Sequence, residues 1–156
     1  MKENELRCIE RIEESFLRQL VSTRRFCKIA LLYLEFGVWP ARFEIKKLRL
    51  LFLKYILNQN KDSTIYNFLQ TQLKSKLKGD FGSMCQRDLC DLEIEMTFND
   101  IKNIKISKFK SLLKEKIANS AFQYLKSNIR NKGKDIPYEQ FQMAEYLLPN
   151  NNLNID

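Results

Sequence analysis

The sequence contains no histidine and no glycine-rich phosphate loop. Without histidine the chain cannot form a Ser-His-Asp or Cys-His catalytic arrangement, and it has no histidine to act as a general base. A Cys/His zinc site is excluded for the same reason. The sequence therefore predicts a protein that is not an enzyme, with no cofactor and no metal site.

The cysteines also lack the spacing of a metal or redox motif. There are four of them and no Cys-x-x-Cys pair; they are Cys8, Cys27, Cys85 and Cys90. Buried, reduced thiols are the expected state, which fits an intracellular protein, either nuclear or cytoplasmic. Residues 2–20 are charged and amphipathic, so they do not resemble a secretion signal.

Turn-forming residues are scarce as well. Four glycines and three prolines in 156 residues supply too few turns for an all-β fold. The apolar spacing instead predicts an all-α fold, a compact bundle of about seven helices. We expect helices over residues 3–20, 24–36, 40–58, 64–74, 81–92 and 108–129, with a short one ending at Ile104 and another at 138–147. The length suits a single domain over residues 1–148 with a frayed tail at 149–156.

Several residues have the properties of helix caps. Gly37 is expected just after the second helix, and Pro40 in the first turn of the third. Thr97 and Asp100 have the spacing of a capping box, and Ser107 is expected to cap the long late helix. Ser22 or Thr23 is a candidate cap for the second helix, and Asp62 or Ser63 is one for the helix that starts near residue 64.

The helix expected over residues 40–58 is apolar around most of its circumference. Such a helix is typically buried at the centre of a fold, so we expect the other helices to pack around it. Its longest uninterrupted apolar run covers residues 50–53 and is flanked by Arg49 and Lys54. That run is far too short to span a bilayer, and no membrane association is expected.

The net charge of +8 is distributed unevenly. Residues 21–78 carry +9 and residues 102–134 carry +9, whereas residues 79–101 between them carry −5. Such segregation attracts polyanions and predicts nucleic acid, as RNA, DNA or a hybrid, as the partner. The alternative is that the lysines are ordinary solvated surface.

Seven residues are the candidate phosphate contacts. Two arginines sit at the expected start of the second helix, three cations are spaced i, i+4 and i+7 on the central helix, and two lysines share one side of the late helix. They are Arg24, Arg25, Arg42, Lys46, Arg49, Lys110 and Lys114. The lysines at 74, 76 and 78 and the series at 102–116 add further charge. The central three could equally mark the solvated edge of a core helix.

Two short patterns suggest chemistry only weakly. Asp80-Phe81-Gly82 matches the metal-binding tripeptide of kinases, but no other kinase motif accompanies it, so a helix entry is the better interpretation. The acidic residues at 88, 91, 93 and 95 are better explained as solvated charge than as a metal site.

Five stretches resemble, in order and spacing, the region downstream of the polymerase core in reverse transcriptases of LINE-like (non-LTR) retrotransposons. They are LLYLEFGVWPARFEIKKLRLLFLKYIL at 31–57, DSTIYNFLQTQL at 62–73, KGD at 78–80, RDLCDL at 87–92 and MAEYLLPN at 143–150. The resemblance covers about residues 30–150. It implies a helical region comparable to a thumb or linker that grips a template–primer duplex or element RNA through its backbone.

The chain departs from that family in three ways. The catalytic aspartates, including those of the Tyr-x-Asp-Asp strand, have no counterpart, and neither does the downstream Cys/His knuckle. Lys47-Leu48-Arg49 stands where the family typically has paired arginines, which weakens a phosphate contact. The chain would be a fragment, a decayed copy or a repurposed piece of such an element.

Two other functions remain open. One is a protein–protein scaffold, which a covered basic ridge or an exposed apolar patch would favour. The other is an auxiliary DNA-binding subunit, which would need a helix-turn-helix with an exposed basic second helix.

Overall fold

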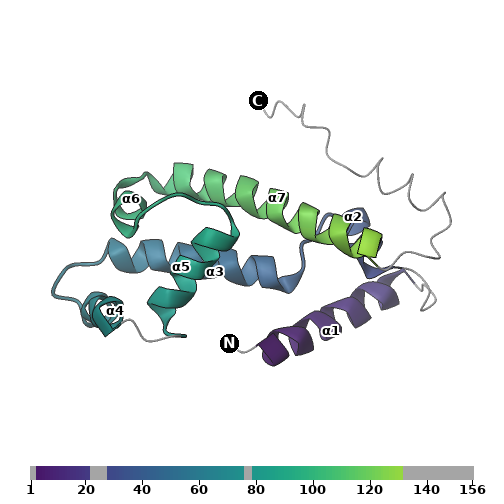
Figure 1. Ribbon diagram of the computed structural model, residues 1–156, viewed down its shortest axis with the longest axis horizontal. Helices are drawn as coiled ribbons and strands as arrows, with labels where there is room; N and C mark the ends of the chain where they lie inside the picture. Colours follow the sequence, from purple (N-terminus) through teal and green to yellow (C-terminus); the bar gives the residue numbers. More distant parts are fainter. Residues whose placement is uncertain (1–2, 22–27, 76–78, 132–156) are drawn as a thin grey trace. The chain divides into compact units, whose positions relative to one another are not determined.

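The computed structural model describes residues 3–21, 28–75 and 79–131, and these form seven α-helices and no strand (Figure 1). The all-α prediction is confirmed. The helices are α1 (Glu3–Leu20), α2 (Ile29–Phe36), α3 (Ala41–Leu57), α4 (Thr64–Ser75), α5 (Phe81–Asp91), α6 (Phe98–Asn103) and α7 (Ile106–Asn131). The helix expected at 138–147, the tail at 149–156 and the cap expected at Ser22 or Thr23 lie outside the described residues. No described helix has the length and apolar character needed to cross a membrane.

The chain divides into two compact units. Unit 1 comprises residues 1–42 and 121–156, and unit 2 comprises residues 43–120. The boundaries fall within α3 and within α7, so both helices contribute residues to each unit. The single domain expected over residues 1–148 stays a prediction.

The core of unit 1 brings together α1, α2 and the end of α7. Its buried residues are Leu17, Ala30, Leu32, Tyr33, Leu125 and Ile129. Gly37 ends α2 in the left-handed conformation, with φ 63°, as predicted. The N–H of Gly37 donates to the carbonyl of Leu34, and the N–H of Val38 donates to that of Tyr33. These two bonds form a Schellman motif, which satisfies carbonyls that the helix leaves unpaired.

Helix α1 packs differently from the expectation. Of its apolar side, Leu17 is buried, but Ile9, Ile12, Phe16 and Leu20 are exposed. Glu13 faces inwards instead, and its Oε2 accepts hydrogen bonds of 2.9 Å from the Tyr33 hydroxyl and from the Ala41 N–H. That carboxylate stabilises the first turn of α3, where N–H groups lack helical partners. Burial and the bond to Glu13 raise the pKa of Tyr33.

In unit 2, α3 is buried along one side. Its buried apolar residues are Phe43, Leu50, Leu53, Ile56 and Leu57. The prediction of a buried central helix is therefore right for this side, whereas Leu48, Phe52 and Tyr55 are exposed.

The Asp80-Phe81-Gly82 tripeptide forms a helix entry, as the sequence analysis favoured. Asp80 Oδ1 accepts a 2.7 Å bond from the N–H of Ser83 and caps α5. Gly82 lets α5 approach α4 closely, because a Cβ at this position would lie 2.9 Å from Leu73 Cδ2. The edge of Phe81 contacts the Phe52 ring. All three residues therefore have structural roles.

Pro40 directly precedes α3, which begins at Ala41, and does not lie in its first turn as expected. Of the three other predicted caps, two are present. Ser63 Oγ accepts from the N–H of Tyr66 at the start of α4. The predicted capping box of α6 is present, since Thr97 and Asp100 bond each other's backbone N–H. The cap expected at Ser107 is wrong, because α7 already begins at Ile106 and its second residue is Ser107. Hydrogen bonding starts from the carbonyl of Lys105, which accepts from Phe109.

Replacing Gly37 tests the Schellman motif. Gly37→Ala should destabilise unit 1 by about 1 kcal/mol, because a Cβ is strained in the left-handed conformation. Gly37→Asn should cost less, since asparagine tolerates this conformation. Urea unfolding followed by the fluorescence of Trp39, the one tryptophan of the chain, measures both. Equal losses for the two variants would contradict the assignment.

The capping box predicts a pH dependence. Hydrogen bonds from Thr97 lower the pKa of Asp100 below its ordinary 3.8. Because the folded pKa is depressed, the ionised carboxylate adds stability above pH 3.8, and this is lost as the pH falls through the folded value. Asp100→Asn should therefore reduce the loss of helix content between about pH 5 and about pH 2, which circular dichroism measures. Glu93→Gln, at an exposed carboxylate outside the capping box, serves as the control, and an identical acid profile in the two variants argues against the cap.

Candidate nucleic-acid interface

Arg42 lies at the start of α3 in unit 1, where it pairs with Glu10 of α1. Its Nε donates to Oε1 of Glu10, and its Nη2 lies 2.6 Å from Oε2. The guanidinium also lies 4.8 Å from the centroid of the Tyr124 ring. Two parallel N–H···O bonds are the strongest way in which arginine holds a carboxylate. Arg42 is therefore engaged within unit 1.

Lys46 and Arg49 pair with carboxylates of α5 in unit 2. Lys46 Nζ donates to Asp91 at 2.6 Å, and Arg49 Nη1 donates to Asp88 at 2.9 Å. The side chain of Asp88 is only 4% exposed, and that of Arg49 is 17% exposed. Burial raises the pKa of Asp88, and the positive charges of Arg49 and Lys46 offset part of this rise. Asp88 and Asp91 thus neutralise α3 cations.

The three cations predicted as a phosphate ridge are each in an ion pair within the fold. A phosphate that approached them would meet positive charge that the carboxylate partners already partly neutralise. The i, i+4, i+7 spacing was visible in the sequence, but the acidic partners were not, because they come from α1 and α5. A role of this ridge in nucleic-acid binding stays a prediction.

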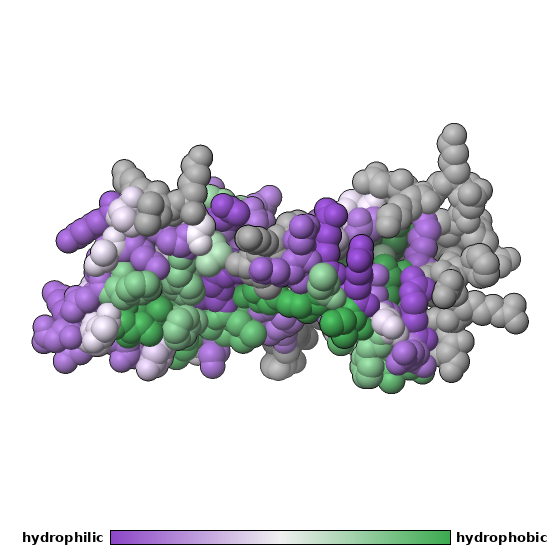
Figure 2. Space-filling view, turned by 90° about the horizontal axis from the view of Figure 1, so that it is seen from below, coloured by the Kyte–Doolittle hydropathy of each residue, from purple (hydrophilic) through white to green (hydrophobic). Residues whose placement is uncertain are grey.

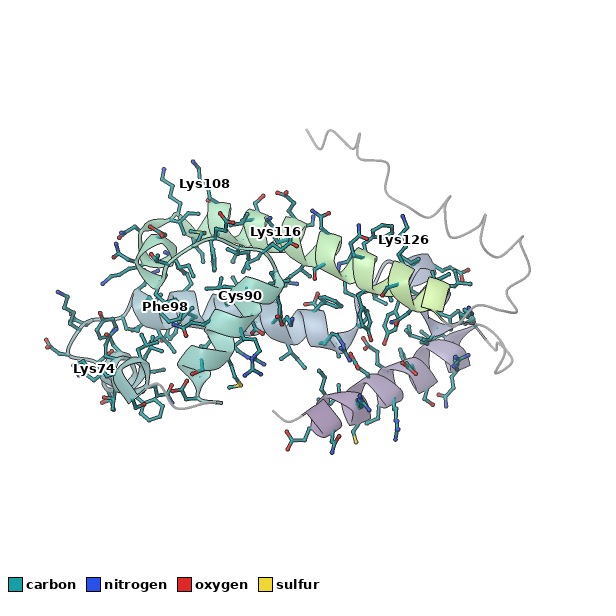
Figure 3. The ribbon with its side chains drawn as sticks, viewed as in Figure 1. Lys74, Cys90, Phe98, Lys108, Lys116 and Lys126 are labelled. Atoms are coloured by element: carbon teal, nitrogen blue, oxygen red, sulfur yellow. The ribbon has the colours of Figure 1, made fainter. Side chains whose placement is uncertain are left out.

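The lysines around the start of α7 have a different environment. Lys110 and Lys114 are exposed one helical turn apart, as predicted, and Lys105 and Lys108 are exposed just before them. Within the described chain, no ion pair or hydrogen bond joins any of these four side chains to another residue. Figure 3 shows Lys108 extending away from the ribbon. We name Lys105, Lys108, Lys110 and Lys114 the lysine cluster. They are neighbours in the sequence, and at 100° per residue Lys110 and Lys114 share one side of α7 while Lys108 lies on another. Arg24 and Arg25 lie outside the described residues.

Lys54 is a buried cation whose structural role the sequence pattern did not indicate. It is 2% exposed, and its Nζ donates 2.7 Å bonds to the carbonyls of Lys102 and Ile104. These carbonyls lie at the end of α6, where helical N–H partners are lacking. Desolvation lowers the pKa of Lys54. The buried ammonium fixes the junction that leads directly into the lysine cluster.

The described residues offer little nucleophilic or metal chemistry. Cys85 is buried, as expected, and burial raises the pKa of its thiol to about 12, so it is not a thiolate at neutral pH. The expectation of buried thiols is wrong for Cys8 and Cys90, which are exposed, and Cys27 lies outside the described residues. In the part of the chain that the structure describes, no three His, Cys, Asp or Glu residues are placed to hold a metal ion.

A second feature of unit 2 is apolar. Leu48, Phe52 and Tyr55 follow one another at i, i+4 and i+7 on α3 and are 45–62% exposed, and Phe68 of α4 is 62% exposed. The rings of Phe52 and Tyr55 are stacked, with centroids 6.0 Å apart. Figure 2 shows apolar side chains gathered on the surface formed by α3 and α4. We name Leu48, Phe52, Tyr55 and Phe68 the apolar stripe.

Breaking the Arg49–Asp88 pair tests its role in unit 2. Arg49→Met should cost roughly 2–4 kcal/mol, because it leaves the Asp88 carboxylate buried without its counter-charge. The double variant Arg49→Met with Asp88→Leu should recover most of this loss. Urea unfolding followed by circular dichroism gives the three free energies.

The exposed pair of Lys47 and Glu44, 2.8 Å apart, is the matched control. Lys47→Met should change the free energy of unfolding by less than about 1 kcal/mol, as for other exposed pairs. If Arg49→Met and Lys47→Met cost the same, the Arg49–Asp88 pair is not a core element.

Comparison with known proteins assigns the chain to no family. No protein-family model, no curated protein and no solved structure matches it. The function is therefore proposed from the charges and surfaces of the described residues, together with the resemblance in the sequence.

Proposed function

We propose that the chain is a non-catalytic, helical nucleic-acid-binding segment that contacts the phosphate backbone through the lysine cluster. The observation that carries this proposal is that four exposed lysines at the start of α7 have no acidic partner within the described chain. Each therefore keeps its charge available to an external anion, in contrast to Arg42, Lys46 and Arg49 of α3.

The chemistry of the cluster fits backbone binding rather than base recognition. Lysine is a point charge on a flexible stem, which suits phosphate contacts without fixed geometry. Residues 102–134 contain Glu115 as their one acidic residue, so the surrounding charge is strongly positive. Such binding depends on the release of counterions and weakens steeply as salt is added.

The resemblance to the region downstream of a retrotransposon polymerase core supports the same role. A thumb-like or linker-like segment would hold a template–primer duplex or element RNA without taking part in catalysis. Within this proposal the α3 cations serve mainly to stabilise the fold. The third function considered, an auxiliary DNA-binding subunit, gains no support, because the cations of α3 are paired.

Filter binding to an RNA–DNA hybrid at low and high salt tests the proposal. The double variant Lys110→Gln with Lys114→Gln should weaken binding at low salt and reduce the slope of log K against log salt by up to about 2, because two phosphate contacts are lost. No binding of the unmodified chain even at low salt would contradict the proposal.

The control is Arg11→Gln with Arg87→Gln, which removes the same charge from two exposed arginines outside the lysine cluster. This variant should keep a salt slope close to that of the unmodified chain. If both double variants lower affinity and slope equally, binding depends on net charge alone and the cluster is not the site.

A protein–protein scaffold remains the second candidate function. It is favoured by the exposed apolar stripe of unit 2, since contiguous exposed apolar side chains mark interaction surfaces. The two functions use different residues, so the chain can have both.

A further inference from the structure

We propose that the apolar stripe of unit 2 is a self-association surface, on which a second copy of this chain docks to form a symmetric dimer. This inference goes beyond the proposed binding of nucleic acid and does not depend on it. It rests on the spacing of the stripe, its area and the charges at its two ends.

The stripe lies on the side of α3 away from its core. At 100° per residue, Leu48, Phe52 and Tyr55 fall within about 60° of one another, roughly opposite Leu50 and Leu57, which are buried. The cations that would ordinarily line a solvated face are instead turned towards α1 and α5. The solvent-facing side of α3 is therefore apolar, which costs free energy unless another surface covers it.

The spacing of the stripe suits a copy of itself. The residues at i, i+4 and i+7 are nearly symmetric about Phe52, so an antiparallel α3 from a second copy would place Leu48 against Tyr55 and Phe52 against Phe52. Contacts of this reciprocal kind define a two-fold interface. Stacked Phe52 and Tyr55 form a fixed surface, since Phe52 is also held by the edge of Phe81 at 5.6 Å.

The exposed apolar area of the stripe is close to the area that a stable dimer interface covers. Large side chains of roughly 200 Å² each, about half to two-thirds exposed, leave roughly 450 Å² of apolar surface on the four residues of the stripe. An interface that is about 60% apolar would then cover roughly 750 Å² on each copy. A standard interface covers about 800 Å² per partner.

The charges beyond the stripe are complementary in the same arrangement. Glu44 lies one turn before Leu48, where its carboxylate is 43% exposed and also pairs with Lys47, and Lys61 is exposed in the turn that follows α3. Antiparallel pairing about Phe52 brings Glu44 of one copy close to the end of α3 of the other, next to the turn that contains Lys61, twice per dimer. An unrelated protein partner would have no reason to match this self-complementary pattern.

Sedimentation equilibrium at increasing concentration, without nucleic acid, tests the dimer. The chain should dimerise at or below about 100 µM, within the range of interfaces of this size. Leu48→Glu should weaken dimerisation at least about thirtyfold, as expected for a central contact residue. Phe68→Glu should weaken it too, and circular dichroism must show that both variants keep their helix content. Ile12→Glu is the control, because Ile12 is 72% exposed on α1 outside the stripe, and this variant should leave the dimer unchanged.

Reversing the charges of Glu44 and Lys61 tests whether the two copies pair in the antiparallel arrangement. Glu44→Lys and Lys61→Glu should each weaken the dimer about threefold to tenfold, because each puts like charges together at both ends. A mixture of the two variants should form a heterodimer with the unmodified affinity, since both ends are again complementary. A chain that stays monomeric, a dimer that Ile12→Glu disrupts instead, or a mixture that gains no affinity would each overturn the proposal.

Discussion

The ion pairs of α3 are the constraint on which the structure of unit 2 depends. Lys46 pairs with Asp91 of α5 at the surface, whereas Arg49 is directed into the fold, where a cation must have its counter-charge. Asp88 supplies that charge at a site where burial opposes ionisation. Arg49 and Asp88 therefore depend on each other. Either one alone would be a costly buried charge, whereas together they join α3 to α5.

This inward placement of charge determines what α3 presents to solvent. Four cations of α3 pair with carboxylates, Lys54 donates to backbone carbonyls, and one apolar side lies in the core. The helix therefore exposes Leu48, Phe52 and Tyr55. Unit 1 follows a similar rule, because α1 directs Glu10 and Glu13 inwards and exposes Ile12 and Phe16. In both helices a charged side chain occupies a core position that an apolar one could have filled.

The sequence predicted the helices well, because helix periodicity and caps are local properties. The bounds of α1 agree with the expected 3–20, and Gly37, Ser63 and the Thr97–Asp100 box act as caps. Ser107 is the exception: hydrogen bonding already starts at Lys105, so the serine lies inside the helix. Local patterns thus gave most elements to within a few residues, whereas α2 begins at Ile29, five residues after the start expected at residue 24.

The candidate site was harder to predict, since it depends on contacts between residues far apart in the sequence. Spacing alone treats Lys46 and Lys110 alike, as exposed cations on a helix. The structure separates them, because a carboxylate 45 residues away pairs with Lys46, while Lys110 has no acidic partner in the described chain. The blockwise charge count contained part of this information: the acidic block at 79–101 supplies Asp88 and Asp91 to the first basic block.

The second basic block contains almost no acidic residue of its own, and its lysines reach solvent next to a junction that Lys54 holds in place. A buried cation that caps α6 thus supports exposed cations at the start of α7. The number of cations on a helix therefore matters less than the acidic residues within reach of them. Those acidic residues determine whether its lysines stabilise the fold or remain available to an external polyanion.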